Sequence, residues 1–407
     1  MPNAFQSTVT GLGILKNYYQ GPIVSQFNDE LKVWRGSEKG KHPWSGLQVN
    51  RPLKTRRNQG IGATSDGGNL PTIGKQTVVQ ATIPAAFNYL RFGITGPMIK
   101  SSMSDMGSFV RSAAYELEEG YVDLKNDVNR QLGWDGTGTL AVMSTAAVAS
   151  TSIVIAGRES VEPALKFIDV DAVVDIYTSA GVLKQAGVTV VSITSGTASS
   201  LTATLTVSPA VTAAATDILV RANSYGQEMK GLLYQLDGAT STVFGIVRAS
   251  YPQTQGNYQD AGGAQLTLDK MQSSFNEGLR RGAAKYSAIY TDFTSERMYN
   301  KLLVADKRYI GEKVQGDGSF SDKDMSYLSF GGVPLVADKD MPQRMIFIAE
   351  GAMTKYVLAE LEFADETGSM FIAQTGTDSL ECRVRLFANL FNEKPAGCAN
   401  LTNYISP

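Results

Sequence analysis

Residues able to carry out catalysis are scarce in this chain. His42 is the only histidine among 407 residues, so every Ser–His, Cys–His or multi-histidine metal arrangement would have to include that one side chain. It lies in the polar stretch KGKHPW, which predicts an exposed and inert histidine. Glu118 and Glu119 are neighbours in a predicted helix. Because adjacent helical residues do not share a face, they cannot form a general acid–base pair.

Sites for phosphate groups or metal ions are also missing from the pattern. The sequence has no GxxxxGK[ST] loop and no GxGxxG motif after a strand, and turns explain its short glycine clusters. Asp169, Asp171 and Asp175 are spaced like carboxylates on a strand, but the glycine turn and closing glutamate of a calcium loop are absent. We interpret them as a solvated strand face. We therefore expect no catalytic residues, no metal site and no cofactor, and we predict that the protein is not an enzyme.

Two cysteines and the N-terminal sequence indicate the cellular compartment in which the chain folds. Cys382 and Cys398 have no CxxC partner, which predicts free thiols in a reducing compartment, with a disulfide or metal site as the minor alternative. The N-terminus lacks a basic segment followed by an apolar one and does not predict a secretory signal. No run of about 18 apolar residues occurs, so no membrane partner is expected.

The most concentrated charge in the chain is a basic run of four side chains: Arg51, Lys54, Arg56 and Arg57. Three interpretations are open: an arm that binds nucleic acid, a solvated loop, or salt bridges to an acidic surface of a neighbouring subunit. The formal net charge of −2 and the lack of interleaved aromatic residues disfavour the first. A candidate acidic partner is one face of a predicted helix, with Glu116, Glu119 and Asp123.

The elements around the basic run indicate an arm rather than a compact core. Residues 36–75 are rich in glycine, proline and polar side chains, and a loop this long is uncommon inside a compact domain. An arm or β-hairpin that reaches onto a neighbour would explain it. Residues 77–95 then predict extended chain, with four candidate buried positions: Val78, Ile83, Phe87 and Phe92.

The clearest helix pattern in the chain covers residues 102–132. Apolar residues from Phe109 to Leu132 recur every three or four positions and form one stripe. Ser104 is a candidate N-cap, and Gly133 is placed to end the helix. Such a helix would be about 45 Å long, which suits a structural spine.

Residues 144–224 differ in composition from the rest of the chain. They contain no Met, Trp, His or Cys and are crowded with Thr, Ser, Ala and Val. Five or more segments alternate apolar and polar residues between turns, a pattern typical of half-buried antiparallel strands. We predict a small inserted β-barrel or sandwich.

Mixed sequence resumes after the β-rich block. Residues 266–284 predict a helix with Leu268, Met271, Phe275 and Leu279 on one face. A buried strand and a second helix should follow, with Ser295 as a possible N-cap. Two short strands with a turn near Met341-Pro342 come next, and a long final strand ends before Pro395.

An extended arm, a spine helix and abundant β-structure without a catalytic constellation favour assembly over catalysis. In this order, the elements resemble the major capsid protein of tailed bacteriophages, whose α+β fold is often called the Johnson fold. The resemblance includes the glycine-rich tip GIGATSDGGNLPTIG, the helix at 102–132 and the ending KPAGCANLTNY. It covers nearly the whole chain apart from residues 144–224.

The resemblance implies a domain organisation with five parts. These are an N-terminal arm (1–46), an extension loop (47–86), a peripheral domain with the spine helix (87–143 and 366–407), an inserted β-domain (144–224) and an axial domain (225–365). The extension loop of one subunit would lie over its neighbour. The basic run from Arg51 to Arg57 would then sit at a subunit junction.

The resemblance also implies the partners. The chain would self-assemble into hexamers and pentamers of an icosahedral virion shell, built in the host cytoplasm. Portal and scaffolding proteins, decoration or cement proteins, and packaged double-stranded DNA held non-specifically would be its other partners. The alternative is a phage or cell-surface binding module carried by the β-rich block.

Overall fold

The computed structural model describes residues 32–40, 44, 46–97, 106–197, 199–283, 285–307, 328–364, 371–373 and 376–406. His42 and the candidate cap Ser104 lie outside these ranges. Within α4, side chains are described only from Glu119 onward. The described chain forms two compact units. The first contains the residues up to Leu132 with Thr242–Gln253 and Met353–Glu393, and the second contains the remainder.

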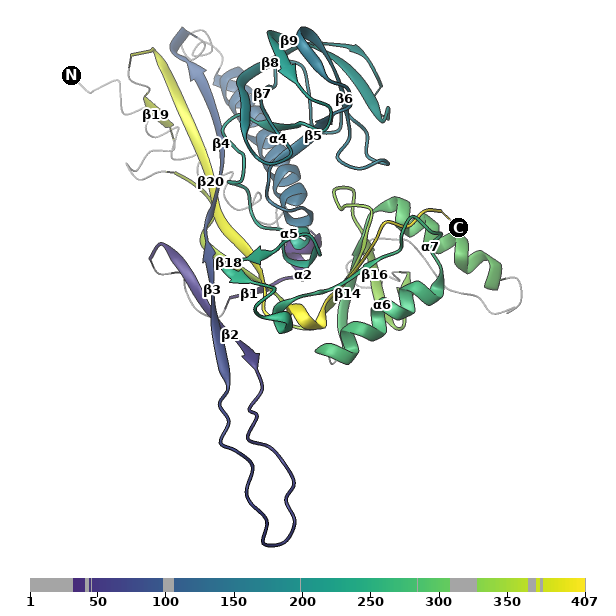
Figure 1. Ribbon diagram of the computed structural model, residues 1–407. Helices are drawn as coiled ribbons and strands as arrows, with labels where there is room; N and C mark the ends of the chain where they lie inside the picture. Colours follow the sequence, from purple (N-terminus) through teal and green to yellow (C-terminus); the bar gives the residue numbers. More distant parts are fainter. Residues whose placement is uncertain are drawn as a thin grey trace, which may run out of the picture. The chain divides into compact units, whose positions relative to one another are not determined.

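The first unit is built on a five-stranded sheet, seen in Figure 1. Its strands are β1 (Glu38–Lys39), β4 (Ala86–Thr95), β18 (Met353–Phe363), β19 (Phe371–Ala373) and β20 (Ser379–Asn392). The long strand β20 is central, because it pairs with β18 and β19 on one side and with β4 on the other.

A long helix, α4 (Met106–Gly133), packs against this sheet, and a short helix, α2 (Lys32–Gly36), precedes β1. The ring of Tyr121 meets that of Phe363 edge to face, with centroids 6.2 Å apart. Gln131 donates a hydrogen bond to the Asn88 side chain on β4 (2.9 Å). The buried stripe matches the predicted one where side chains are described: Tyr121, Leu124, Val128 and Leu132.

A hairpin of β2 (Gln48–Arg56) and β3 (Thr77–Pro84) also belongs to the first unit, as does the small pair β11 (Thr242–Val243) and β12 (Ile246–Val247). The predicted burial in this region was partly wrong. Ile83 is fully buried, but Val78 and Phe87 are 55% and 54% exposed. Ala85 lies between β3 and β4, and one extra residue reverses which alternate side chains face the core. Odd positions are therefore buried in β3 and even ones at the start of β4.

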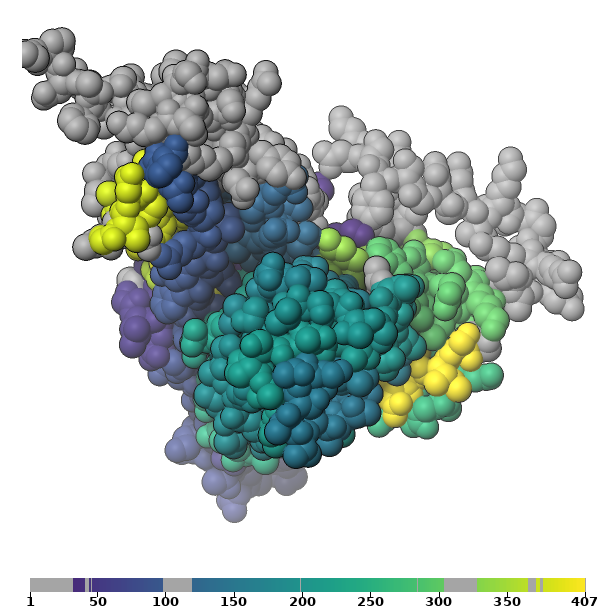
Figure 2. All heavy atoms as spheres, turned by 90° about the horizontal axis from the view of Figure 1, so that it is seen from above, coloured from purple at the N-terminus to yellow at the C-terminus, as the bar shows by residue number. Residues whose placement is uncertain are grey.

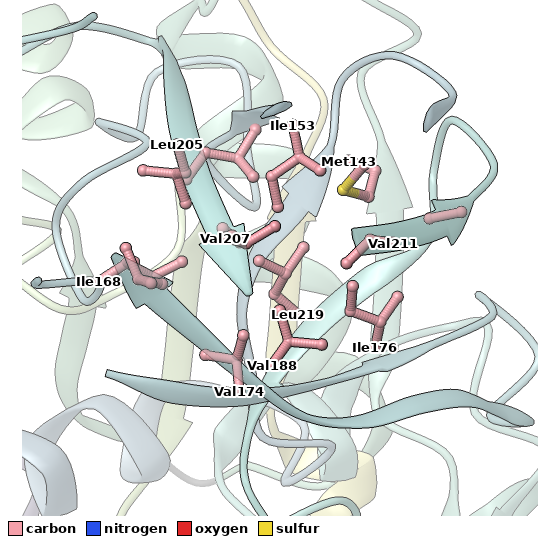
Figure 3. Packing of buried hydrophobic residues seen from close by; sticks show 14 of the residues in the cluster. Met143, Ile153, Ile168, Val174, Ile176, Val188, Leu205, Val207, Val211 and Leu219 are labelled. Atoms are coloured by element: carbon pink, nitrogen blue, oxygen red, sulfur yellow. The ribbon is translucent and has the colours of Figure 1, made fainter. Parts of the chain in front are cut away.

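The second unit contains a closed six-stranded barrel, whose core is shown in Figure 3. Its strands are β5 (Thr139–Met143), β6 (Ala147–Ala156), β7 (Val173–Tyr177), β8 (Leu183–Ser195), β9 (Thr202–Ala213) and β10 (Ile218–Arg221). Alternate aliphatic residues such as Ile153, Val188 and Leu205 fill the interior. The barrel begins before residue 144, because β5 pairs with both β6 and β10 and so closes it.

A six-stranded mixed sheet forms the rest of this unit, in the order β13-β21-β17-β14-β16-β15. The strands are β13 (Asn257–Asp260), β14 (Tyr286–Thr291), β15 (Ser329–Phe330), β16 (Val333–Ala337), β17 (Met345–Ala349) and β21 (Ala399–Thr402). The helical segments are α5 (Leu232–Leu236), α6 (Leu268–Arg281), α7 (Phe293–Lys307), and the 3-10 turns η1 (Pro252–Thr254) and η2 (Pro395–Gly397). The predicted turn at Met341-Pro342 does separate β16 from β17.

Besides the start of the barrel, Thr242–Gln253 lies in the first unit although residues 225–365 were predicted as one domain, and two further boundaries also differ from the predicted domains. Residues 353–363 were expected with 225–365, but they form β18, whose backbone pairs along β20 in the first unit. Residues 394–407 were expected with the spine helix, but β21 pairs with β13 and β17 in the second unit. Backbone pairing between distant segments decides these assignments, and no local pattern reveals it.

Candidate subunit interface

The hairpin arm, which we define as β2, β3 and the connecting residues 57–76, carries most of the predicted site. Its strands pair from Gln48↔Pro84 to Arg56↔Thr77. The loop continues beyond them without strand structure, as Figure 1 shows. Gly60 and Gly74 bring its two sides together, since a Cβ on Gly74 would collide with the Gly60 nitrogen. Two glycines therefore allow a narrow arm.

The base of the hairpin arm is anchored in the first unit. Ala81 and Ile83 are fully buried. The Thr82 amide donates to the Phe244 carbonyl oxygen (2.9 Å), and Asn389 donates to the Pro84 carbonyl oxygen (2.8 Å). Because these contacts stop near the base, they fix where the arm starts and leave its far end exposed.

Arg51 is part of this anchor. Its guanidinium lies 2.8 Å from a carboxylate oxygen of Glu393, which also accepts a hydrogen bond from the Tyr356 hydroxyl (2.9 Å). Burial and the Glu393 carboxylate raise the pKa of Tyr356, so the hydroxyl keeps its proton. Arg51 therefore has a partner within its own chain.

The other three predicted cations are placed differently. Alternation along β2 turns Arg51 and Leu53 to the more buried face, while Lys54 and Arg56 lie on the exposed face. Arg57 follows in the loop and is also exposed. None of these three makes an ion pair with another residue that the structure describes. They remain available to an acidic partner.

Apolar side chains are exposed on the same arm. Ile61, Leu70 and Ile73 in the loop are all more than four-fifths exposed, and Ile73 reaches 98%. Exposing several large aliphatic side chains together is unfavourable in water, so such groups commonly mark a contact with another molecule. In the sequence pattern this tip is marked only by its glycines.

The predicted acidic counterpart is partly described. Glu119 and Asp123 are exposed on α4 and make no ion pair with described residues. The side chain of Glu116 lies outside the described residues. By contrast, Asp127 contacts Arg130 within the same helix (3.0 Å). Whether these acids meet the basic run in a neighbouring subunit stays a prediction.

An aromatic cluster on β4 and β20 was missed by the sequence analysis. Phe87 and Tyr89 both lie edge to face against Phe387, with centroids 4.9 and 5.3 Å apart. Both β4 rings are more than half exposed. The alternation Phe87-x-Tyr89 signalled a shared face, but its exposure depends on α4 packing against the opposite side of β4.

The described residues hold no group of three or more His, Cys, Asp or Glu that could bind a metal ion. Asp175 is buried and accepts hydrogen bonds from the Gly187 and Asn223 amides (both 2.8 Å), so its role is structural. Cys382 and Cys398 are buried free thiols, and burial raises the pKa of Cys382 to about 12. Among the described helices, none has the length and apolar character to cross a bilayer.

Solved structures show similarity across almost the whole chain. A chain of the cyanophage A-1(L) capsid asymmetric unit is 14% identical with a TM-score of 0.55, covering 92% of this chain and 93% of that one. Chains from the capsid of a native GTA particle (10% identity, TM-score 0.48, coverage 93% and 91%) and from Gordonia phage Cozz (10%, 0.41, 92% and 86%) are more distant. No protein-family model and no curated protein matches the sequence. The first similarity shows that this chain has the fold of a phage capsid chain.

Proposed function

We propose that this chain is a major capsid protein that self-assembles into the hexamers and pentamers of an icosahedral phage head. The observation that carries the proposal is the capsid fold, shared at a TM-score of 0.55 over 92% of the chain. In this role the protein is structural rather than catalytic, and its location is the virion shell around packaged DNA. The alternative of a binding module is not favoured, because the similarity extends far beyond the β-rich block.

The hairpin arm is the proposed extension loop, which lies over a neighbouring subunit. Lys54, Arg56 and Arg57 offer three cations that make no ion pair with the described residues, and Ile61 and Ile73 offer exposed apolar surface. The acidic face of a neighbour's α4, with Glu116, Glu119 and Asp123, is the proposed electrostatic partner. Opposite charges across such a contact favour correct register more than raw affinity, so the apolar tip would supply much of the affinity.

The domain names follow from the same proposal. Residues 1–46 are the N-terminal arm, whose strand β1 joins the five-stranded sheet. That sheet with α4 is the peripheral domain, and the six-stranded sheet is the axial domain. The barrel is an inserted domain between the spine helix and the axial domain. Portal and scaffolding proteins are proposed partners during assembly, with decoration or cement proteins afterwards. Contacts with DNA would be non-specific, consistent with a net charge of −2.

Negative-stain electron microscopy and light scattering of the expressed full chain test this function. We expect closed shells of megadalton mass, or separate hexamers and pentamers. Assembly should be tried across salt and protein concentration, with and without candidate scaffolding protein. A chain that stays a folded monomer under all of these conditions would contradict the proposal.

A further inference from the structure

The segment between β6 and β7 leaves the barrel wall and carries a cluster of charge. Between Gly136 and Ile168 the chain has four charged residues, and all lie in this segment: Arg158, Glu159, Glu162 and Lys166. Such clustering is unexpected for a β-rich block whose strands are mostly uncharged. Each of the four side chains has a defined partner.

Arg158 and Glu162 form the centre of the cluster. Two guanidinium nitrogens of Arg158 contact the two carboxylate oxygens of Glu162 at 2.8 and 2.5 Å. The guanidinium carbon lies 3.5 Å from the centre of the Trp134 ring and 4.6 Å from that of Phe167. The side chains of Arg158 and Glu162 are only 3% and 9% exposed. A buried pair with two hydrogen bonds and two aromatic neighbours holds its geometry tightly.

The rest of the cluster joins the barrel to the loop between β16 and β17, residues 338–344. Lys166 lies 3.3 Å from the buried carboxylate of Asp340 and donates to the Lys339 carbonyl oxygen (2.6 Å). Glu159 accepts a hydrogen bond from the Gln343 amide (2.6 Å). Trp134, which precedes the barrel, donates to the Asp340 carbonyl oxygen (2.8 Å).

Arg344 extends the connection to a third segment. Its guanidinium lies 3.8 Å from Glu159 and 3.2 Å from Asp237, the residue that follows α5. Three segments therefore meet here: residues 158–166 of the barrel, residues 339–344 and Asp237. Figure 2, seen from above, shows the teal atoms of the barrel nearest the viewer, with green atoms beside them in projection.

From this cluster we infer that the barrel is a brace of the six-stranded sheet, locked to it as one cooperatively unfolding body, and not a detachable appendage. Buried charges are costly to separate from their partners, and losing one partner of a buried pair typically costs about 3–5 kcal/mol. Moving the barrel away would separate Lys166 from the buried Asp340 carboxylate and Glu159 from the Gln343 amide and Arg344 at once. The inference goes beyond the proposed function and does not depend on it.

The test compares a perturbation inside the barrel with one at the junction. Lys184 and Asp217 form an ion pair within the barrel (2.5 Å), so the K184M/D217N variant weakens the barrel alone. Native-state hydrogen exchange of the full chain would follow peptides from β8–β9 and from β14–β17. If barrel and sheet unfold as one body, K184M/D217N lowers protection in both sets of peptides by the same factor.

The junction variant K166M/D340N provides the second arm. In that background K184M/D217N should lower protection of β8–β9 while leaving β14–β17 unchanged. Loss of protection confined to β8–β9 in the otherwise native chain would overturn the inference, whatever the junction variant does. Because this outcome needs no junction substitution, the test remains decisive if K166M/D340N fails to fold. Particle formation is not a readout, so failure of the proposed capsid role would not affect the result.

Discussion

At the scale of single residues, the charges of this chain fall into two groups. Arg51, Arg158 and Lys166 are tied to carboxylates of their own chain. Lys54, Arg56 and Arg57 are exposed and make no ion pair with a described residue. The first group contributes contacts within the chain, and the second is the group that we propose acts between subunits. From the sequence, all four residues of the basic run were predicted alike as contacts to a neighbouring subunit.

Reversing the unpaired charges should impair assembly without unfolding the subunit. We expect R56E/R57E to leave the thermal midpoint nearly unchanged, because neither side chain has a partner in the described chain. Particle yield should fall severalfold at low salt, and the difference should shrink as salt screens the charges. Light scattering during assembly measures both effects. The matched control is R280E/K285E, which reverses two exposed cations of the second unit; equal loss in the control would contradict a specific role for the arm.

Two neighbouring acids in the brace should respond to pH in opposite directions. Burial alone would raise the pKa of Glu162, but hydrogen bonds and charge from Arg158 and Lys166 lower it below 4.5. Its stabilising effect is therefore present above that pH and lost as pH falls. Burial raises the pKa of Glu159, and Glu162 and Asp292 add to this, although the Gln343 amide and Arg344 oppose it.

Thermal midpoints of E162Q and E159Q between pH 3 and 7 measure this contrast. The destabilisation caused by E162Q should be largest near pH 7 and diminish toward pH 3. For Glu159 the pH dependence has the opposite sign, because its raised pKa means that the folded state holds the carboxyl proton more strongly than the unfolded state does. The contribution of Glu159 to the stability of the wild type therefore falls as pH rises above 4.5, and E159Q should gain stability relative to the wild type over that range. Parallel pH profiles for the two variants would contradict the assigned shifts.

At the scale of elements, local signals located helices well but misassigned their ends. Ser295 was the candidate N-cap of the second helix after the barrel, whereas α7 begins at Phe293. Asp292 accepts hydrogen bonds from the Thr294 and Ser295 amides (both 3.0 Å). The Ser295 hydroxyl is instead 2.6 Å from that of Tyr404. Asp292 is the single residue between β14 and α7, so the apolar pattern of the strand runs directly into that of the helix and hides the cap.

Removing the observed cap should destabilise the second unit. We expect D292A to lower the free energy of unfolding by about 1–2 kcal/mol, since a cap carboxylate satisfies helix amides that have no other partner. S273A, an exposed serine in α6, is the matched control and should cost little. Urea unfolding followed by circular dichroism gives both values. A D292A midpoint equal to that of S273A would show that Asp292 does not cap the helix.

At the scale of the whole molecule, apolar side chains fall into two groups: those buried in the barrel and beside the sheets, and those exposed on the hairpin arm. Aliphatic side chains fill the barrel, and aromatic contacts such as Phe275 with Phe347 (6.2 Å) lie beside the six-stranded sheet. The hairpin arm instead leaves Ile61, Leu70 and Ile73 in solvent. The exposed loop of the arm, residues 57–76, buries little apolar surface and so contributes little to the stability of a single chain. Its exposed apolar side chains are the reason that we propose a neighbouring subunit covers it.

Assembly should therefore protect the arm selectively. We expect hydrogen exchange at residues 57–76 to slow at least tenfold in particles relative to unassembled subunits. The reason is that a neighbour covering the exposed apolar side chains would also shield the backbone amides of these residues from solvent. Barrel strands β8 and β9 serve as the internal control, since their amides are already paired within the closed barrel. Unchanged exchange at the tip in assembled particles would rule out the arm as an interface.

Local features can be predicted from the amino-acid order alone: the α4 stripe, the β-rich block, the extended arm and the lack of a recognisable catalytic motif. Periodicity and turn residues suffice for these, because they reflect which side chains must be buried within one element. The order of the elements also carried the resemblance to capsid proteins. The structural similarity later showed that fold.

Only the tertiary structure decided which elements lie together. Residues 394–407 joined the second unit because β21 pairs with β13 and β17, strands from distant parts of the chain. Phe87 is exposed because Ala85, between β3 and β4, shifts the alternation, so that even-numbered rather than odd-numbered side chains are buried at the start of β4. Arg51 differs from Lys54 because Glu393, 342 residues away, lies beside it. Long-range pairing and side-chain direction arise from the assembled fold, so they leave little trace in any local stretch of sequence.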